Sequence, residues 1–120
     1  MPTIKTEGYH VGEWLVSEAD GTRSRDVATV TVAGGVGLPS GTVLGKVTAT
    51  GKLIKYDNAA SDGSQAAVGV LYNELPAVNG DYKATVFTRD CEVDGAILNG
   101  GSGVDAAGKA DLLALGVVVR

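Results

Sequence analysis

The sequence predicts a mainly β protein: a small barrel- or sandwich-like domain with one short C-terminal helix and an extended N-terminal arm. The first observation behind this fold class is composition, since the 120 residues include 18 glycines and only 5% are aromatic. Many glycines among many valines are typical of short strands joined by tight turns. The second is a series of short alternating apolar segments, and the third is a change to helical spacing near the C-terminus. At this length we expect one domain plus an arm.

Residues 1–33 differ from the rest of the chain and predict the arm. Met1–Gly8 is polar and irregular, and Tyr9–Glu18 alternates loosely enough to be extended. After a charged, turn-like stretch, Val27–Ala33 is expected to form a short strand. One face of this strand carries Ala28, Val30 and Val32. The glycine-rich run Gly34–Gly41 marks the boundary between the arm and the body.

The body, residues 34–120, is expected to be a β meander. Short stretches rich in apolar residues are bounded by glycine, proline and asparagine turn signals. The expected strands are Val43–Thr48, Leu53–Tyr56, Ala67–Leu71, Tyr82–Val93 and Ala96–Leu98. Glycines in the intervening turns, such as Gly51 and Gly80, supply the positive φ that tight turns need.

From Asp105 the period changes, and a short helix is expected. The stretch is rich in alanine, leucine and lysine, which favour helices, and its apolar positions recur at spacings of three and four. These positions are Ala106, Ala110 and Leu113. Asp105 suits the N-cap, and Gly116 suits the left-handed residue that ends a helix. Val117–Val119 then predicts a last short strand.

The charge balance argues against nucleic acid as a partner. The net charge is −4 with a pI near 4.8, whereas binding to phosphate backbones needs clustered Lys and Arg. No apolar stretch reaches about 18 residues, so no membrane partner is expected. The first residues also lack the apolar region of a signal peptide. We therefore expect a soluble protein made in the cytoplasm.

No arrangement of side chains predicts catalysis, a metal or a cofactor. Gly103–Ala110 matches the phosphate-binding glycine loop except at its end, where alanine replaces the hydroxyl residue that holds Mg²⁺. His10 is the one histidine, which does not favour a catalytic triad, and Asp57–Gly63 lacks the full calcium-binding pattern. Cys91, the one cysteine, is expected to be a small core residue. We expect a protein that is not an enzyme and has no small-molecule substrate.

The arm contains the one tryptophan of the chain, Trp14, within a cluster of apolar and aromatic residues. Such residues outside the main body indicate an intermolecular site, because an isolated arm has no core of its own. An extended arm can also add a strand to the edge of a partner's sheet. The alternative is that this segment forms another strand of the protein's own barrel.

Three short sequence elements follow one another between Leu38 and Leu71. They are G-T-V-L-G-K, Y-D-N-A-A and D-G-S-Q-A-A-V-G-V-L. In order and spacing they resemble the lambda-type head decoration family of tailed bacteriophages. The C-terminal D-L-L-A-L-G-V-V-V-R fits this family as well, so the likeness covers residues 34–120, and the arm is similar in kind only.

The resemblance implies a capsid decoration protein on the outer surface of the virion. It implies a homotrimer that binds the major capsid protein at threefold and quasi-threefold sites of the expanded head. There the trimer would brace the shell against the pressure of packaged DNA. The resemblance also implies that the arm orders on the capsid. The capsid-binding residues would then be Thr3, Ile4, Tyr9, Val11, Trp14, Leu15 and Val16.

Two other classes of protein are the alternatives. A host- or glycan-binding module displayed on the virion needs exposed aromatic platforms, for which one Trp, four Tyr and one Phe are a thin supply. A small hydrolase or nucleotide enzyme needs a catalytic arrangement that the lone His10 and the incomplete glycine loop do not provide.

Overall fold

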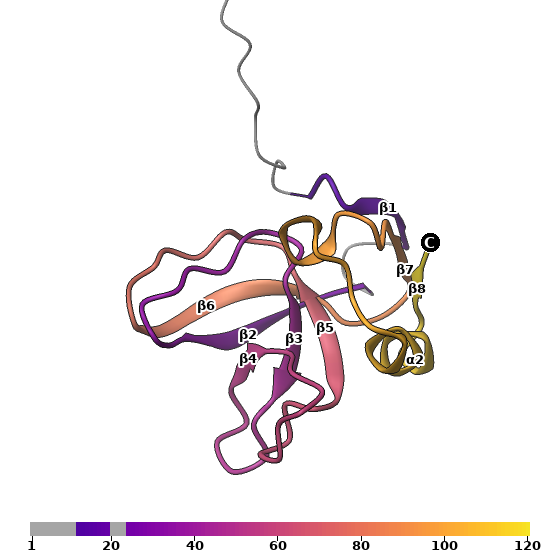
Figure 1. Ribbon diagram of the computed structural model, residues 1–120. Coiled ribbons are helices and arrows are strands. Elements are labelled where there is room, and N and C mark those ends of the chain that lie inside the picture. The colour runs from indigo at the N-terminus through magenta and orange to yellow at the C-terminus, as the bar shows by residue number, and fades with distance from the viewer. Residues whose placement is uncertain (1–11, 20–23) are drawn as a thin grey trace, which may run out of the picture.

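The chain folds into a β-barrel with a small sheet and a helix at its side, as the computed structural model describes for residues 12–19 and 24–120 (Figure 1). Five strands close the barrel in the order β2-β4-β3-β5-β6, and three others form the sheet β1-β7-β8. Helix α2 packs against β8 and β5. The predicted mainly β fold class with one short C-terminal helix is confirmed.

The elements are short, as expected for a chain rich in glycine turns. The strands are β1 (Leu15–Glu18), β2 (Arg25–Val32), β3 (Val43–Lys46), β4 (Leu53–Lys55), β5 (Ala67–Leu71), β6 (Gly80–Phe87), β7 (Cys91–Val93) and β8 (Val117–Val119). The helical elements are the 3₁₀ turn η1 (Leu98–Gly101) and the helix α2 (Ala106–Ala114). Strands β5 and β8 have the bounds that the sequence predicts.

The barrel is organised by the long antiparallel pair β2 and β6, which runs from Arg25 opposite Phe87 to Val32 opposite Gly80. A parallel contact between β2 and β4 closes it, with Val30 opposite Leu53. The predicted alternation on β2 is confirmed, since Val30 and Val32 are buried whereas Val27 on the other face is exposed. A side-chain period of two is what places one face of the strand in the core.

Three barrel strands contribute to two hydrophobic cores, because successive side chains of a strand point to opposite faces. The barrel core includes Leu44 of β3, Leu71 of β5 and Val86 of β6. Their sequence neighbours Val43, Val70 and Phe87 belong to a second core, shared with the small sheet and α2. The two cores therefore lie back to back on β3, β5 and β6.

The folded body begins before the predicted boundary at residue 33. Residues 25–32 belong to the barrel, because β2 pairs with β6 along one edge and with β4 along the other. Residues 15–18 pair as β1 with β7. The interpretation of residues 1–33 as an arm is therefore corrected at these two strands, while residues 1–11 and 20–23 lie outside the described part of the chain.

The predicted single strand Tyr82–Val93 is two strands. The chain leaves the barrel after Phe87 and enters the small sheet at Cys91, and the left-handed backbone of Asp90 (φ 53°) lies at the bend. Alternation of apolar residues does not reveal such a change of sheet, because both halves bury alternate residues. The prediction of a strand over Ala96–Leu98 was wrong, because Ala96 and Ile97 lie in a turn and Leu98 begins η1.

Helix α2 has the predicted caps but buries a different face. The Asp105 side chain accepts a hydrogen bond from Gly108 N at 2.7 Å, and Gly116 follows the helix with φ 91°. The buried helix residues are Gly108 and Leu112, whereas the predicted apolar positions Ala106, Ala110 and Leu113 are exposed. Burying Gly108 brings the helix close to Tyr56, since a Cβ there would lie 3.1 Å from the Tyr56 ring.

Candidate functional site

Residues 12–19 are held on the barrel by Trp14. This side chain has no exposed surface. Its ring meets the Phe87 ring edge to face, with centroids 5.2 Å apart and planes at 86°. Edge-to-face packing of this kind is a favoured aromatic geometry and adds to the gain from burying a large side chain. Trp14 is thus a core residue that joins the segment to the barrel strand β6.

The Ser40 hydroxyl satisfies the polar groups around the Trp14 ring. Its oxygen accepts hydrogen bonds from Trp14 Nε1 at 2.9 Å and from Gly12 N at 3.1 Å. The same hydroxyl donates to the Tyr72 carbonyl at 2.6 Å. A serine hydroxyl has one proton and two lone pairs, so these three bonds use its full capacity. One side chain therefore ties both the backbone and the ring of the N-terminal segment to the barrel.

Gly41 shapes the space that the indole ring fills. Its φ of 90° is left-handed, and a Cβ at this position would lie 2.7 Å from Trp14 Cδ1. A separation below 3.0 Å requires something to move. Glycine thus serves both the backbone conformation and the close approach of the tryptophan.

Main-chain hydrogen bonds fix the rest of the segment on the small sheet. Strand β1 lies antiparallel to β7, and Asp94 N donates to the Trp14 carbonyl at 2.7 Å. At the other end, Ala19 N donates to the Asp90 carbonyl at 2.9 Å. Residues 12–19 are therefore docked on the body along their whole length, and we call them the docked segment.

An ion pair holds the C-terminal end of the docked segment. Arg25 donates to the Glu18 carboxylate through Nε at 3.1 Å and through Nη2 at 2.5 Å, so the pair is bidentate. The Ser24 hydroxyl donates to the same carboxylate at 2.6 Å. The Arg25 guanidinium also lies over the rings of Tyr72 and Phe87, 5.2 and 4.9 Å from their centroids. Charge and cation–π contacts thus cover the aromatic cluster around Trp14.

The predicted contact residues have different positions in the structure. Trp14, predicted as a capsid-binding residue, is buried within the chain, where the Phe87 contact and the Ser40 bond occupy its ring and its N–H group. Leu15 is half-buried against the same core. Val16 is 55% exposed and available to a partner. Thr3, Ile4, Tyr9 and Val11 lie outside the described residues, as does His10.

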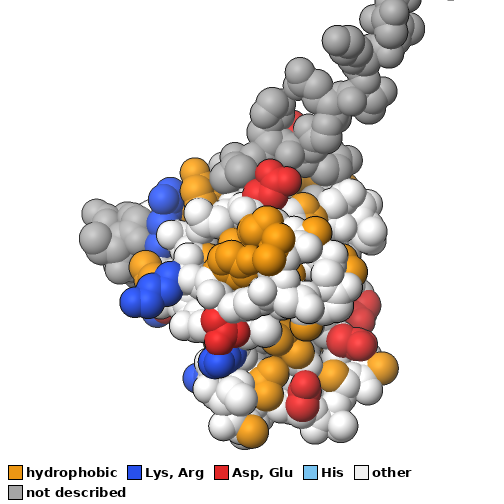
Figure 2. Space-filling view, turned by 90° about the vertical axis from the view of Figure 1, so that its left-hand side faces the viewer, with side chains coloured by type: hydrophobic (Ala, Val, Ile, Leu, Met, Phe, Trp, Pro, Cys, Tyr) orange, Lys and Arg blue, Asp and Glu red, His pale blue; other side chains and the backbone are white. Residues whose placement is uncertain are grey.

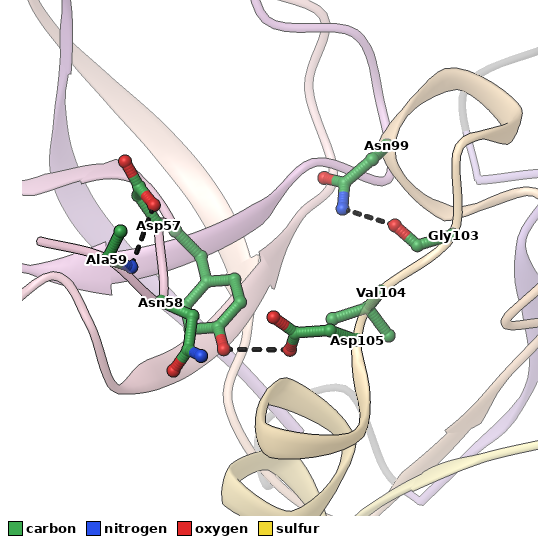
Figure 3. A pocket seen from close by; sticks show the side chains of 8 residues that line it. Asp57, Asn58, Ala59, Asn99, Gly103, Val104 and Asp105 are labelled. Carbon is green, nitrogen blue, oxygen red and sulfur yellow. Dashed lines mark hydrogen bonds between the residues drawn. The ribbon is translucent and has the colours of Figure 1, made fainter.

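A shallow pocket of about 390 Å³ lies between the β4–β5 loop and the start of α2 (Figure 3). The Tyr56 hydroxyl donates to Asp105 at 2.8 Å, Asp57 accepts from Ala59 N, and Asn99 donates to the Gly103 carbonyl. Burial, together with the Asp105 hydrogen bond, raises the pKa of Tyr56 to about 12. A general base at neutral pH needs a much lower pKa.

The sequence predicted that Gly103–Ala110 is a glycine loop leading into a capped helix, and the structure confirms this prediction.

Within residues 12–19 and 24–120, no three His, Cys, Asp or Glu residues are grouped as metal ligands would be. No helix in the same ranges is long and apolar enough to cross a membrane. Asp62, within the predicted solvated turn, is engaged locally, since its carboxylate accepts hydrogen bonds from the backbone and hydroxyl of Ser64.

Comparison with known families supplies the identification. The family model described as bacteriophage lambda head decoration protein D matches residues 4–117. The chain belongs to this head decoration family. No curated protein matches the chain. Membership assigns the chain to capsid decoration, to the phage virion and to a family whose role is structural. The match begins at residue 4, so it covers much of the region that the sequence resemblance left out.

The decoration protein therefore has a core tryptophan where its sequence suggested a free arm. Sequence reasoning missed Ser40, Arg25 and Glu18 as the partners of the docked segment. Glu18 and Arg25 are seven residues apart, and Ser40 lies 26 residues from Trp14, so no short local motif joins either pair. The sequence did offer the alternative that this segment forms another strand of the barrel. The segment does contain a strand, β1, but β1 pairs in the small sheet.

Proposed function

We propose that this decoration protein binds as a homotrimer at threefold and quasi-threefold sites on the outside of the expanded phage head. There it holds neighbouring major capsid proteins together against the pressure of packaged DNA. The observation that carries the proposal is the family match across residues 4–117, almost the entire chain.

The proposed capsid contact is the N-terminal part of the chain up to Val16. It includes Thr3, Ile4, Tyr9 and Val11, and the exposed side chain of Val16 on β1 extends it onto the body. Ordering a segment on a partner costs conformational entropy, so one such contact alone binds weakly. Three segments on one trimer make the later contacts intramolecular and raise avidity by about 10²–10⁴.

Exposed apolar surface supports contact between copies of the chain. Val36 follows β2 and Val78 precedes β6, and these side chains are 64% and 62% exposed. Figure 2 shows the face on the left of Figure 1, where hydrophobic side chains gather near the centre. Apolar surface of this kind is typical of protein–protein contacts. Each copy carries a net charge of −4, and acidic surfaces on two copies would repel each other. Contact between copies is therefore favoured at an apolar surface.

The alternative of a glycan-binding module is weakened by the placement of the aromatic residues. Trp14 and Phe87 have no exposed surface, so neither ring offers a platform to a sugar. A glycan-binding surface would depend on tyrosines alone.

The first test is the solution mass of the purified chain by light scattering. A trimer of 12.1 kDa chains has a mass near 36 kDa. The second test is binding to undecorated expanded capsids by the chain that lacks residues 1–11, a deletion that leaves the docked segment intact. We expect this variant to stay trimeric and to lose capsid binding. Full occupancy of capsids by the shortened chain would contradict the proposed contact.

A further inference from the structure

The docked segment fixes the residues that directly follow the N-terminal part of the proposed capsid contact, and we propose that Trp14 and Ser40 act as a positioning anchor for capsid binding. This inference rests on the proposed function, because it concerns how the capsid-binding residues are presented. In this role Trp14 touches no capsid protein; it fixes the starting point of the chain that does.

The anchor holds the backbone immediately next to the proposed contact residues. Gly12 N donates to Ser40 Oγ at 3.1 Å, one residue after Val11. Two residues later the buried Trp14 ring donates to the same oxygen at 2.9 Å. Since Ser40 in turn donates to the Tyr72 carbonyl, this position of the chain is tied to the barrel itself.

The contacts on both sides of Trp14 prevent the anchor from sliding along the sheet. The Trp14 carbonyl accepts from Asp94 N at 2.7 Å, which sets the register with the residue after β7. Glu18 is held by Arg25 through a bidentate pair. The space for the ring is shaped for it, because even a Cβ on Gly41 would collide with the indole. The position of the residues that follow Val11 is therefore defined by side-chain, backbone and charge contacts together.

The consequence for binding follows from the length of chain between the body and its contact. If the segment were released, at least residues 12–19 would be added to the chain between Val11 and the body. The effective concentration of a tethered group falls roughly as the −3/2 power of linker length once the linker can span the distance. The loss applies to each of three arms, so a modest loss per arm becomes a large loss of avidity.

The test lengthens the chain at the anchor without touching the core. A flexible six-residue Gly-Ser insertion between Val11 and Gly12 leaves every described contact in place. The matched control carries the same insertion between Pro2 and Thr3, which keeps residues 3–11 at their natural distance from the anchor. We expect the insertion after Val11 to weaken binding to undecorated expanded capsids about tenfold or more, and the control to change it less than about twofold. Equal binding by the two variants overturns the inference.

A double-mutant cycle separates positioning from simple stability. Ser40→Ala removes the shared acceptor and is measured in the natural chain and in the chain with the insertion after Val11. We expect Ser40→Ala to weaken capsid binding in the natural chain and to add little in the lengthened chain, where the anchor no longer positions the contact. Equal losses in both chains would show a purely structural serine and overturn the inference.

The deletion of residues 1–11 distinguishes failure of this inference from failure of the proposed function. If the deleted chain still decorates capsids fully, the proposed contact is wrong and the anchor has nothing to position. If deletion abolishes binding while the insertion after Val11 has no effect, the contact stands and the positioning role of the anchor is wrong.

Discussion

At the residue scale, the contacts of one side chain, Trp14, hold the docked segment on the body. Its ring needs an aromatic partner, an acceptor for its N–H group and space, which come from Phe87, Ser40 and Gly41. Ser40 and Gly41 are neighbours in the sequence and Phe87 lies far from both, and each of the three meets a different requirement of the same ring. A buried N–H group without an acceptor would cost about 1–3 kcal/mol, so the serine is as necessary as the apolar contact.

Replacing Trp14 with alanine should strongly destabilise the protein. The change removes a large, fully buried side chain, and core Trp→Ala substitutions typically cost about 3–5 kcal/mol. Val16→Ala is the matched control, because its side chain is more than half exposed and should change the free energy of unfolding by less than about 0.5 kcal/mol. Urea denaturation measures both. Similar midpoints for the two variants would contradict the burial of Trp14.

Ionisation of the buried Cys91 thiol is expected to lower the stability of the fold at alkaline pH. Burial, with the nearby negative charges of Glu18 and Asp90, raises the pKa of its thiol from 9.0 to about 11. Because the folded pKa is the higher one, the stabilisation is fully present below pH 9 and is lost as the pH rises toward 11. The thermal midpoint of the wild type should therefore fall more steeply over this range than that of Cys91→Ala. Parallel curves would rule out a contribution from the thiol.

At the scale of the element, helix α2 shows that an apolar pattern does not by itself identify the buried face. Its sequence has alanine or leucine on several sides, so a spacing of three and four can be found on more than one face. The structure buries Leu112, which is large, and Gly108, which permits close approach, and leaves the alanines in solvent. Burying a leucine gains much more than burying an alanine, because the gain follows the apolar area removed from water.

Two neighbouring leucines of α2 therefore make a matched pair. Leu112→Ala should cost about 2–5 kcal/mol of unfolding free energy, because the side chain is buried in the second core. Leu113→Ala should be nearly neutral, since Leu113 is 61% exposed. Helix propensity favours alanine over leucine only slightly and works equally at both positions. A larger loss at Leu113 than at Leu112 would reverse the assignment of the buried face.

The whole molecule is held together by strands that serve two cores at once. Leu44, Leu71 and Val86 face the barrel core, while their neighbours Val43, Val70 and Phe87 face the small sheet and α2. Loss of β3, β5 or β6 would expose both cores together. The barrel and its side layer should therefore behave as one cooperative unit, despite the separate hydrogen-bonded sheets.

Coincident unfolding transitions are the expected result. Trp14, the one tryptophan, reports on the second core through its fluorescence, whereas far-UV circular dichroism reports on all the strands. A single cooperative unit gives the same midpoint and slope with both probes in urea. An earlier fluorescence transition would show that the small sheet and the docked segment unfold before the barrel.

Much of the fold could be predicted from the sequence because the signals are local. Short apolar runs predicted the strands β5 and β8 with the bounds that the structure has, and Asp105 and Gly116 marked the ends of α2. Caps, turns and alternation depend on neighbours in the chain, and these neighbours are visible in the sequence. The order and spacing of motifs in residues 38–71 likewise indicated the decoration family, which the match to residues 4–117 confirms.

Only the tertiary structure decided which surfaces these elements share. The burial of Trp14 depends on Ser40 and Phe87, the break after Phe87 sends one alternating stretch into two sheets, and the buried face of α2 depends on contact with Tyr56. Each outcome is a choice between partners that are distant in the sequence. The free energy of burial depends on which partners meet in space. A local pattern can therefore predict that a residue is buried, but not which residues it packs against.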